Sequence, residues 1–102
     1  MTRQIDFTGK SGTIYRYTAL DEGRALPPAG ANYLIVEDAG AGATILFAGE
    51  TDNLSRSDWR APLAQARAQH KDAEVLTRLN VRGAVRQAEQ ADLIEAYTPL
   101  MN

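Results

Sequence analysis

The pattern of hydrophobic and polar positions predicts two β-hairpins in the first half of the chain. The residues of 13–20 alternate between two faces of a strand, Ile14, Arg16 and Thr18 on one and Tyr15, Tyr17 and Ala19 on the other. A shorter strand over 5–8 precedes this one, and the turn 9–12 joins them. A second hairpin is expected from the apolar run 33–37 and the strand 44–48, joined by the turn 38–42.

The second half of the chain is predicted to hold two helices with a strand between them. Residues at helical spacing define the buried face of the first helix: Trp59, Leu63, Ala66 and His70. We expect Ser57 or Asp58 to cap this helix. Residues 73–79 alternate in polarity and favour a strand over a short helix. The last helix is expected over 81–97, where a proline follows closely.

This order of elements predicts an α+β fold with a mainly antiparallel sheet and helices packed against it. Residues 21–30 contain two glycines and two prolines and are expected to form a loop. A chain of 102 residues is long enough for one hydrophobic core. We therefore expect a single domain over 1–102.

Composition narrows the class of protein. Hydrophobic residues make up 44% of the chain and charged residues 24%, as in ordinary globular domains. There is no cysteine, which excludes a disulfide scaffold, a zinc-thiolate site and a thiol nucleophile. The first residues lack an apolar signal region, and no apolar run approaches the length of a membrane span. We therefore expect a cytoplasmic protein without membrane contact.

The charge balance bears on nucleic-acid binding. The chain carries 11 Lys and Arg residues against 13 Asp and Glu residues, a formal net charge of −2. Proteins that bind nucleic acid usually carry a positive surplus, because neutralising phosphates supplies much of their affinity. We expect weak or no nucleic-acid binding.

Two strings resemble the GIY-YIG endonuclease superfamily. The string FAGETDNL over 47–54 looks like the second tyrosine-containing strand of that family and the turn after it. The string DLI over 92–94, followed by Pro99 and Asn102, matches the closing pattern of the family in residue type and spacing. The strings occur in the family order, separated by a predicted helix and strand.

The resemblance covers residues 30–102 and implies a GIY-YIG-like core there, with residues 1–29 as an added N-terminal hairpin. It implies a phosphodiesterase ancestry that used a divalent cation such as Mg²⁺ or Mn²⁺. It also assigns family roles to individual positions, several of which are substituted in this chain.

The implied catalytic positions begin with Tyr33, which stands where the first family motif ends in a tyrosine. A phenol there is thought to help deprotonate the attacking water. The alternative is that the ring of Tyr33 packs in the core with its hydroxyl at the rim. Phe47 replaces the tyrosine of the second motif and lacks its hydroxyl, whereas Gly49 is retained.

The family next places an arginine that holds the scissile phosphate, and Ser57 stands at that position. Arg56 and Arg60 are nearby substitutes, and with Arg67 and Lys71 they could form a basic stripe for phosphate. The alternative is a solvated helix face opposite the buried one.

At the position of the metal-binding glutamate, this chain has Gln90. A neutral amide lacks the charge that makes a carboxylate a good ligand for a hard cation. Helical spacing predicts that Gln90 faces the sheet. Glu89 is an adjacent substitute, although its side chain is rotated by about 100°. As an alternative, we expect Glu89 to pair with Arg86 or Arg82 on the surface.

The phenol, guanidinium and carboxylate of the family thus appear as Phe47, Ser57 and Gln90. Without these charges, little remains to stabilise a phosphoryl-transfer transition state. We therefore expect a GIY-YIG-like domain that has lost catalysis, needs no cofactor and acts as a binding module.

Two alternatives remain open. One is an active divergent endonuclease that cleaves DNA or RNA with Mg²⁺ or Mn²⁺, using Arg56 or Arg60 and Glu89 as substitutes. The other is an oligomeric or protein-interaction domain whose surface is the N-terminal hairpin over 1–29. The sequence does not name the ligand, and a protein partner or self-association fits either binding role.

Overall fold

The computed structural model describes residues 3–38 and 42–102, so the middle of the predicted turn 38–42 lies outside the described residues. The elements are β1 (Gln4–Thr8), β2 (Ile14–Ala19), β3 (Ala31–Asp38), β4 (Ala43–Thr51), the 3₁₀ helix η1 (Leu54–Arg56), α1 (Arg60–Arg67), β5 (Glu74–Leu79) and α2 (Gly83–Tyr97). Among these described residues, no helix is long and apolar enough to cross a membrane.

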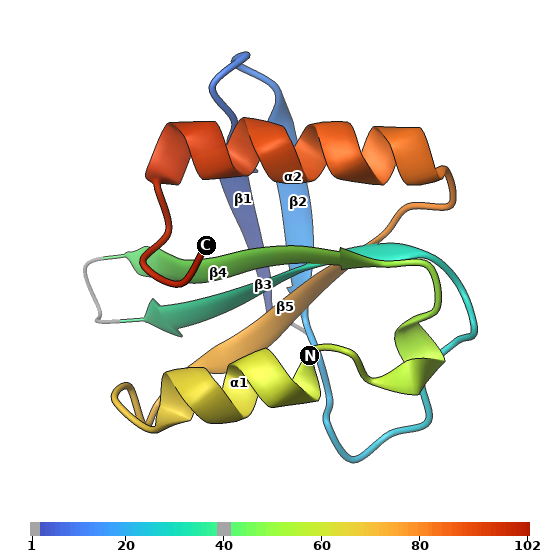
Figure 1. The fold of residues 1–102 in the computed structure, drawn as a ribbon, viewed down its shortest axis with the longest axis vertical. Coiled ribbons are helices and arrows are strands. Elements are labelled where there is room, and N and C mark those ends of the chain that lie inside the picture. Colours follow the sequence, from blue (N-terminus) through green and yellow to red (C-terminus); the bar gives the residue numbers. More distant parts are fainter. Residues whose placement is uncertain (1–2, 39–41) are drawn as a thin grey trace.

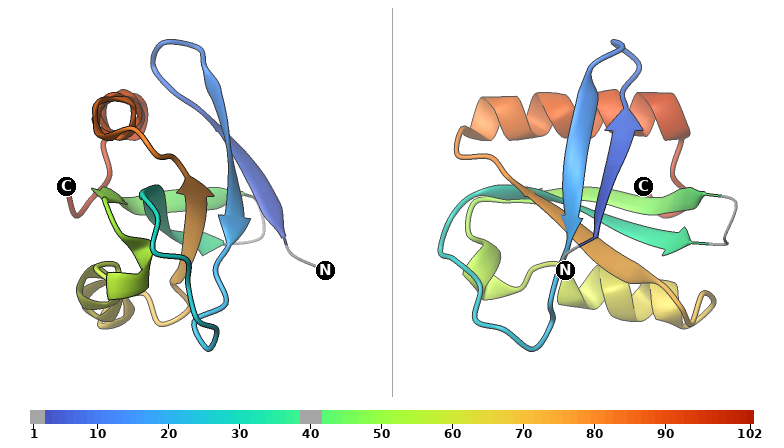
Figure 2. Two further views of the ribbon diagram at one scale, coloured as in Figure 1. Left: turned by 90° about the vertical axis from the view of Figure 1, so that its right-hand side faces the viewer. Right: turned by 180° about the vertical axis from the view of Figure 1, so that it is seen from behind.

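Within the described residues, the strands form one sheet of five in the order β1-β2-β5-β3-β4, with every neighbouring pair antiparallel. The sheet curls around α2 (Figures 1 and 2). The β1–β2 hairpin lies alongside α2, and β3 and β4 pass below this helix in the view of Figure 1. Helix α1 packs on the opposite face (Figure 1). The predicted α+β class with a mainly antiparallel sheet is confirmed.

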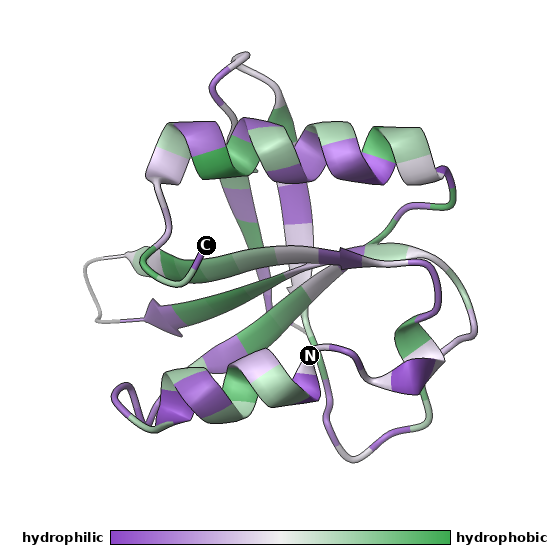
Figure 3. Ribbon diagram, in the orientation of Figure 1, coloured by the Kyte–Doolittle hydropathy of each residue, from purple (hydrophilic) through white to green (hydrophobic). Residues whose placement is uncertain are grey.

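Strand β3 is buried along nearly its whole length because helices cover both of its faces. Residues 31–36 are all buried. Tyr33 and Ile35 belong to the cluster that packs beneath α1, whereas Leu34 and Val36 belong to the cluster beneath α2. Figure 3 shows that hydrophobic residues dominate the central strands. A nearly continuous apolar run is typical of a strand covered on both sides.

The start of α1 differs from the prediction. Trp59 occupies the N-cap position, and no side chain among the described residues caps this helix. Ser57 and Asp58 do not cap α1, because the Asp58 side chain makes another hydrogen bond and the Ser57 backbone ends η1. Asp58 accepts a hydrogen bond of 2.7 Å from the Thr51 hydroxyl, and Ser57 ends η1 in the left-handed conformation at φ 59°. The predicted buried face is confirmed at Trp59, Leu63 and Ala66. His70 lies beyond the end of α1 and is only half-buried, with Nδ1 3.3 Å from a Glu37 carboxylate oxygen.

Strand β4 also runs further than predicted. It continues through Gly49 to Thr51, where register pairs join Tyr33 to Gly49 and Ala31 to Thr51. Glycine therefore lies inside this strand and does not end it. The chain turns only at Asp52 and Asn53, whose side chain caps η1 by accepting a hydrogen bond from the Ser55 amide.

The N-terminal hairpin is fastened to α2 at its tip. The Asp92 carboxylate accepts hydrogen bonds from the Ser11 amide at 2.8 Å, the Ser11 hydroxyl at 2.7 Å and the Tyr15 hydroxyl at 2.7 Å. The Thr8 amide donates to the Tyr97 hydroxyl at 3.1 Å. Phe7 packs edge-on against the ring of Tyr97. These contacts close the curl of the sheet around α2.

We expect Asp92→Asn to weaken the fold in a pH-dependent way. The hydrogen bonds from Tyr15 and Ser11 hold the pKa of Asp92 below its ordinary value. Such a carboxylate adds stability above its unfolded pKa of about 4, and the contribution is lost as the pH falls through the folded-state pKa. The variant should therefore be less stable than the parent at neutral pH, and the difference should shrink in acid.

Urea denaturation at neutral pH and below about pH 3 measures this difference. Asp72→Asn is the control, because Asp72 is exposed on the turn between α1 and β5. A difference between parent and Asp92→Asn that stays constant across this pH range would contradict the assignment.

Candidate functional site

Three of the predicted site residues meet on the α1 side of β3 and β4. The rings of Tyr33 and Phe47 lie 6.0 Å apart at an angle of 32°. Gly49 pairs with Tyr33 across the strands, and a Cβ atom added at Gly49 would lie 2.3 Å from Cζ of Tyr33. The glycine is thus required by the close approach of a tyrosine ring.

The Tyr33 hydroxyl has an unfavourable setting for a general base. Its side chain is buried, and burial raises its pKa, with further contributions from the negative charges of Asp58 and Glu50. The phenol is therefore protonated at neutral pH. It can donate a hydrogen bond, but it is a poor acceptor of a proton from water. This geometry fits the core-packing alternative.

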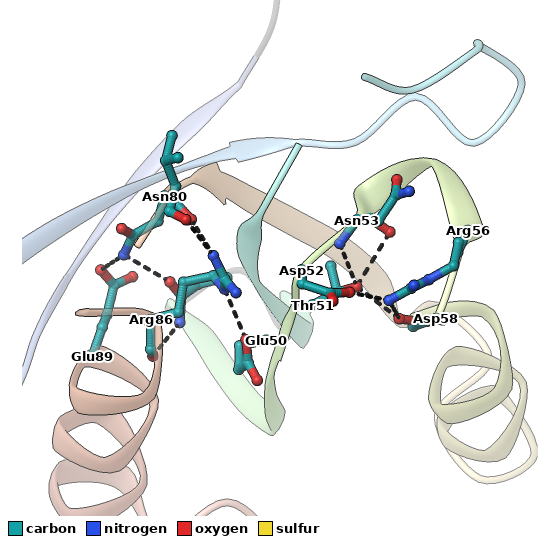
Figure 4. A network of polar contacts seen from close by, with 11 residues as sticks. Glu50, Thr51, Asp52, Asn53, Arg56, Asp58, Asn80, Arg86 and Glu89 are labelled. Carbon is teal, nitrogen blue, oxygen red and sulfur yellow. Dashed lines mark hydrogen bonds and ion pairs between the residues drawn. The ribbon is translucent and has the colours of Figure 1, made fainter. Parts of the chain in front are cut away.

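The residues at the predicted phosphate position are engaged with acidic neighbours. Ser57 lies at the end of η1, where its amide donates to the Leu54 carbonyl at 3.1 Å. The guanidinium of Arg56 forms an ion pair with Asp52 and lies 3.7 Å from a carboxylate oxygen of Asp58 (Figure 4). The positive charge of Arg56 is therefore balanced locally.

Two other arginines of the predicted basic stripe are also engaged with neighbouring residues. Arg60 stacks on the indole of Trp59, with its guanidinium carbon 4.5 Å from the ring centre, and donates to the Glu22 carbonyl at 3.3 Å. Arg67 forms a two-pronged pair with the Glu22 carboxylate at 2.9 and 3.2 Å. Lys71 is exposed beyond the end of α1. The structure does not assemble these residues into one open phosphate site.

Gln90 faces the edge of the sheet. Its amide nitrogen donates to the Ala48 carbonyl at 3.1 Å. The side chain of Asn102 grips the same residue, donating to the Ala48 carbonyl at 2.9 Å and accepting from the Ala48 amide at 2.7 Å. Strand β4 is one of the two edge strands of the described sheet, so these amides satisfy backbone groups that no neighbouring strand reaches.

The prediction that Glu89 pairs with Arg86 or Arg82 on the surface is wrong. Its side chain is 2% exposed and lies between α2 and the curled sheet. The carboxylate accepts hydrogen bonds from the Tyr17 hydroxyl and from Nε of Arg78, the latter at 3.1 Å. The prediction fails because the hairpin covers the side of α2 that an open sheet would leave in solvent.

Arg86 is also buried and pairs with Glu50 of β4 at 2.8 Å (Figure 4). Its guanidinium donates to the carbonyls of Asn80 and Val81 at 3.0 and 2.8 Å. A Cβ atom at Gly30 would lie 2.3 Å from the guanidinium, so the loop before β3 needs glycine there. The buried face of α2 therefore includes Arg86 and Glu89 together with the apolar Leu93, whereas Gln90 is only half-buried.

A chain of amides links these charged pairs. The side-chain nitrogen of Asn32 donates to the Arg86 carbonyl at 2.9 Å, and that of Asn80 donates to the side-chain oxygen of Asn32 at 3.0 Å. The Asn80 nitrogen also lies 3.4 Å from the Glu89 carboxylate. Asn32 carried a signal in the sequence, because it is a polar residue at the start of an apolar strand. Asn80 carried none.

The side chains at the implied metal position do not fit a divalent cation. Gln90 supplies a neutral amide, and the carboxylate of Glu89 is surrounded by its own hydrogen-bond donors. Mg²⁺ is usually bound through carboxylates that remain open to water or phosphate. Within residues 3–38 and 42–102, no group of three or more His, Cys, Asp or Glu side chains is placed to hold a metal ion.

Comparisons with protein-family models, with curated proteins and with solved structures found no match. Membership of the GIY-YIG superfamily therefore stays a proposal.

We expect Glu89→Gln to lower the free energy of unfolding by about 1–3 kcal/mol, because the amide leaves buried donors without a charged acceptor. Urea denaturation measures the change. Glu95→Gln is the matched control, since Glu95 is exposed on the same helix. Equal effects of the two substitutions would refute the role of Glu89 in holding α2.

We expect Gly49→Ala to destabilise the domain by about 1–3 kcal/mol, because its methyl group would overlap the ring of Tyr33. Gly23→Ala is the control, since its methyl group would meet its nearest neighbour at 3.5 Å. The second substitution Tyr33→Val should recover part of the loss, and thermal denaturation reads out all three proteins. Failure of any recovery would show that the close approach is not the cause.

Proposed function

We propose that this chain is a GIY-YIG-like domain that has lost nuclease chemistry and acts as a binding module. The two strings that carry the resemblance support this proposal, because they meet in space. Asn102, which closes the second string, holds both backbone groups of Ala48 in the first. Gln90 of α2 reaches the same carbonyl.

The observation that carries the loss of catalysis is the hydrogen bond from Gln90 to the Ala48 carbonyl. The position assigned to a metal ligand thereby supplies a neutral group that is occupied in holding a strand. Cleavage of a phosphodiester requires positive charge at the developing phosphorane, most often from a cation and a guanidinium. An amide fixed to the backbone offers neither.

The other groups of the proposed ancestral site are also engaged in contacts within the domain. Phe47 has no hydroxyl, and burial keeps the phenol of Tyr33 protonated. Arg56, which precedes Ser57 in the chain, is paired with aspartates. Each group therefore contributes to packing or to local charge balance, and the exposed surface is left for recognition.

We expect no metal-dependent cleavage of labelled DNA or RNA by the purified chain with Mg²⁺ or Mn²⁺. Calorimetry with either cation should show no binding. Tyr33→Phe is the informative variant, because it removes the hydroxyl and keeps the ring. Cleavage by the parent that disappears in Tyr33→Phe, with unchanged thermal stability of the variant, would overturn the proposal in favour of an active nuclease.

A further inference from the structure

Residues 98–102 cover the outer edge of β4. From the end of α2 this segment descends to β4 (Figure 1). The Met101 amide donates to the Leu46 carbonyl at 2.9 Å. The Asn102 side chain accepts from the Ala48 amide at 2.7 Å and donates to the Ala48 carbonyl at 2.9 Å. These are backbone groups that the next strand of a sheet would bind.

The side-chain amide of Asn102 takes the place of a strand residue opposite Ala48. In a hydrogen-bonded pair of antiparallel strands, each residue donates its amide to the other and accepts through its carbonyl. A side-chain amide has both an acceptor and donors, so it satisfies both backbone groups of Ala48 at once. Gln90 donates to the Ala48 carbonyl at 3.1 Å. The Ala48 amide depends on Asn102, which is therefore the residue that closes this edge to strand pairing.

Strand β4 needs such a cover because its sequence favours pairing. Residues 44–49, TILFAG, contain no charged residue and no proline. An apolar, uncharged strand at an open edge is prone to pair with a strand of another molecule. Many edge strands are protected by a lysine or a proline of their own. In this stretch the protection has to come from residues outside the strand.

The covering segment leaves α2 through a strained residue. Thr98 follows the helix with φ 42° and ψ 62°, in the left-handed region. Threonine is branched at Cβ and is rarely found in this conformation. Pro99 is buried and Met101 packs against the cluster beneath α1, whereas Leu100 is 74% exposed. A few contacts therefore hold the segment closed against the strain at Thr98.

We propose that residues 98–102 act as a releasable strap, and that their release lets two copies of this chain pair edge to edge through β4. A two-fold axis at Ala48 would let the Ala48 amide of each copy donate to the Ala48 carbonyl of the other. Antiparallel pairing in this register places Glu50 opposite Leu46 of the other copy, so no like charges face each other.

A second copy is the favoured occupant because the edge is self-complementary about Ala48. The Ala48 carbonyl can accept two hydrogen bonds, so the bond from Gln90 does not have to break when Asn102 leaves. Edge pairing of this kind uses backbone groups of β4 and is independent of the proposed loss of catalysis.

Asn102→Ala tests the strap in the full chain, because it removes both side-chain bonds to Ala48. We expect sedimentation equilibrium to show a dimer dissociation constant about tenfold or more below that of the parent, since two bonds that compete with pairing are lost. Asn102→Asp keeps the acceptor and loses the donor, so its affinity should be intermediate. Leu100→Ala is the matched control and should behave like the parent. Asn102 and Leu100 are exposed, so these variants should keep a cooperative thermal transition.

Hydrogen exchange of the Ala48 amide locates the interface. In dilute Asn102→Ala this amide should exchange about tenfold or more faster than in the parent, because it has lost its acceptor. At millimolar concentration, where the dimer forms, its exchange should slow again. The Asp6 amide of β1, the other edge strand, should exchange at the same rate at both concentrations.

Thr98→Asn is the opposite change, because it should tighten the strap. Asparagine tolerates a positive φ better than threonine does, so the closed position becomes less strained. We expect slower exchange of the Ala48 amide and a dimer dissociation constant about threefold or more above that of the parent.

Any of three results would overturn the inference. The first is Asn102→Ala that is no more dimeric than Leu100→Ala. The second is an exchange rate of the Ala48 amide in Asn102→Ala that stays the same when the dimer forms, which would place the interface elsewhere. The third is Thr98→Asn that dimerises more tightly than the parent.

Discussion

The position of α2 depends on a carboxylate buried between the helix and the curled sheet. Glu89 accepts hydrogen bonds from Tyr17 of β2 and Arg78 of β5, and an amide of Asn80 lies close by. A carboxylate is costly to bury unless its partners are all in place. These contacts therefore fix the rotation of α2 about its axis and its position over β2 and β5. The pair of Arg86 and Glu50 fixes the same helix to β4, the far edge of the sheet.

This packing decides what the end of β4 is able to do. Gln90 and Asn102 form hydrogen bonds with the backbone of Ala48, and the ring of Tyr33 packs closely against Gly49, which has no side chain. Gln90 and Asn102 thereby join the outer edge of β4 to α2 and to the end of the chain. The opposite happens where β2 leaves β5. There the sheet opens, and guanidinium groups such as that of Arg24 stay exposed.

Local sequence patterns were sufficient for most of the secondary structure. The alternation of 13–20 and the helical spacing from Trp59 predicted β2 and α1 because each element buries one face against a single layer. The cap of α1 and the end of β4 were predicted wrongly. The end of β4 depends on its pairing with β3 as far as Ala31. The start of α1 depends on the hydrogen bond between Thr51 and Asp58 and on the left-handed backbone of Ser57.

The sequence by itself determined the α+β class, the hairpins and the helices, because their periodicities express contacts that are local or repeat along one face. It also identified Gln90 as a neutral group at a position where the family resemblance implies a carboxylate. Only the tertiary structure decided that Glu89 and Arg86 are buried. Their partners lie 72 and 36 residues away in the chain, and the charged face of a helix resembles a solvated face until a curled sheet is wrapped around it.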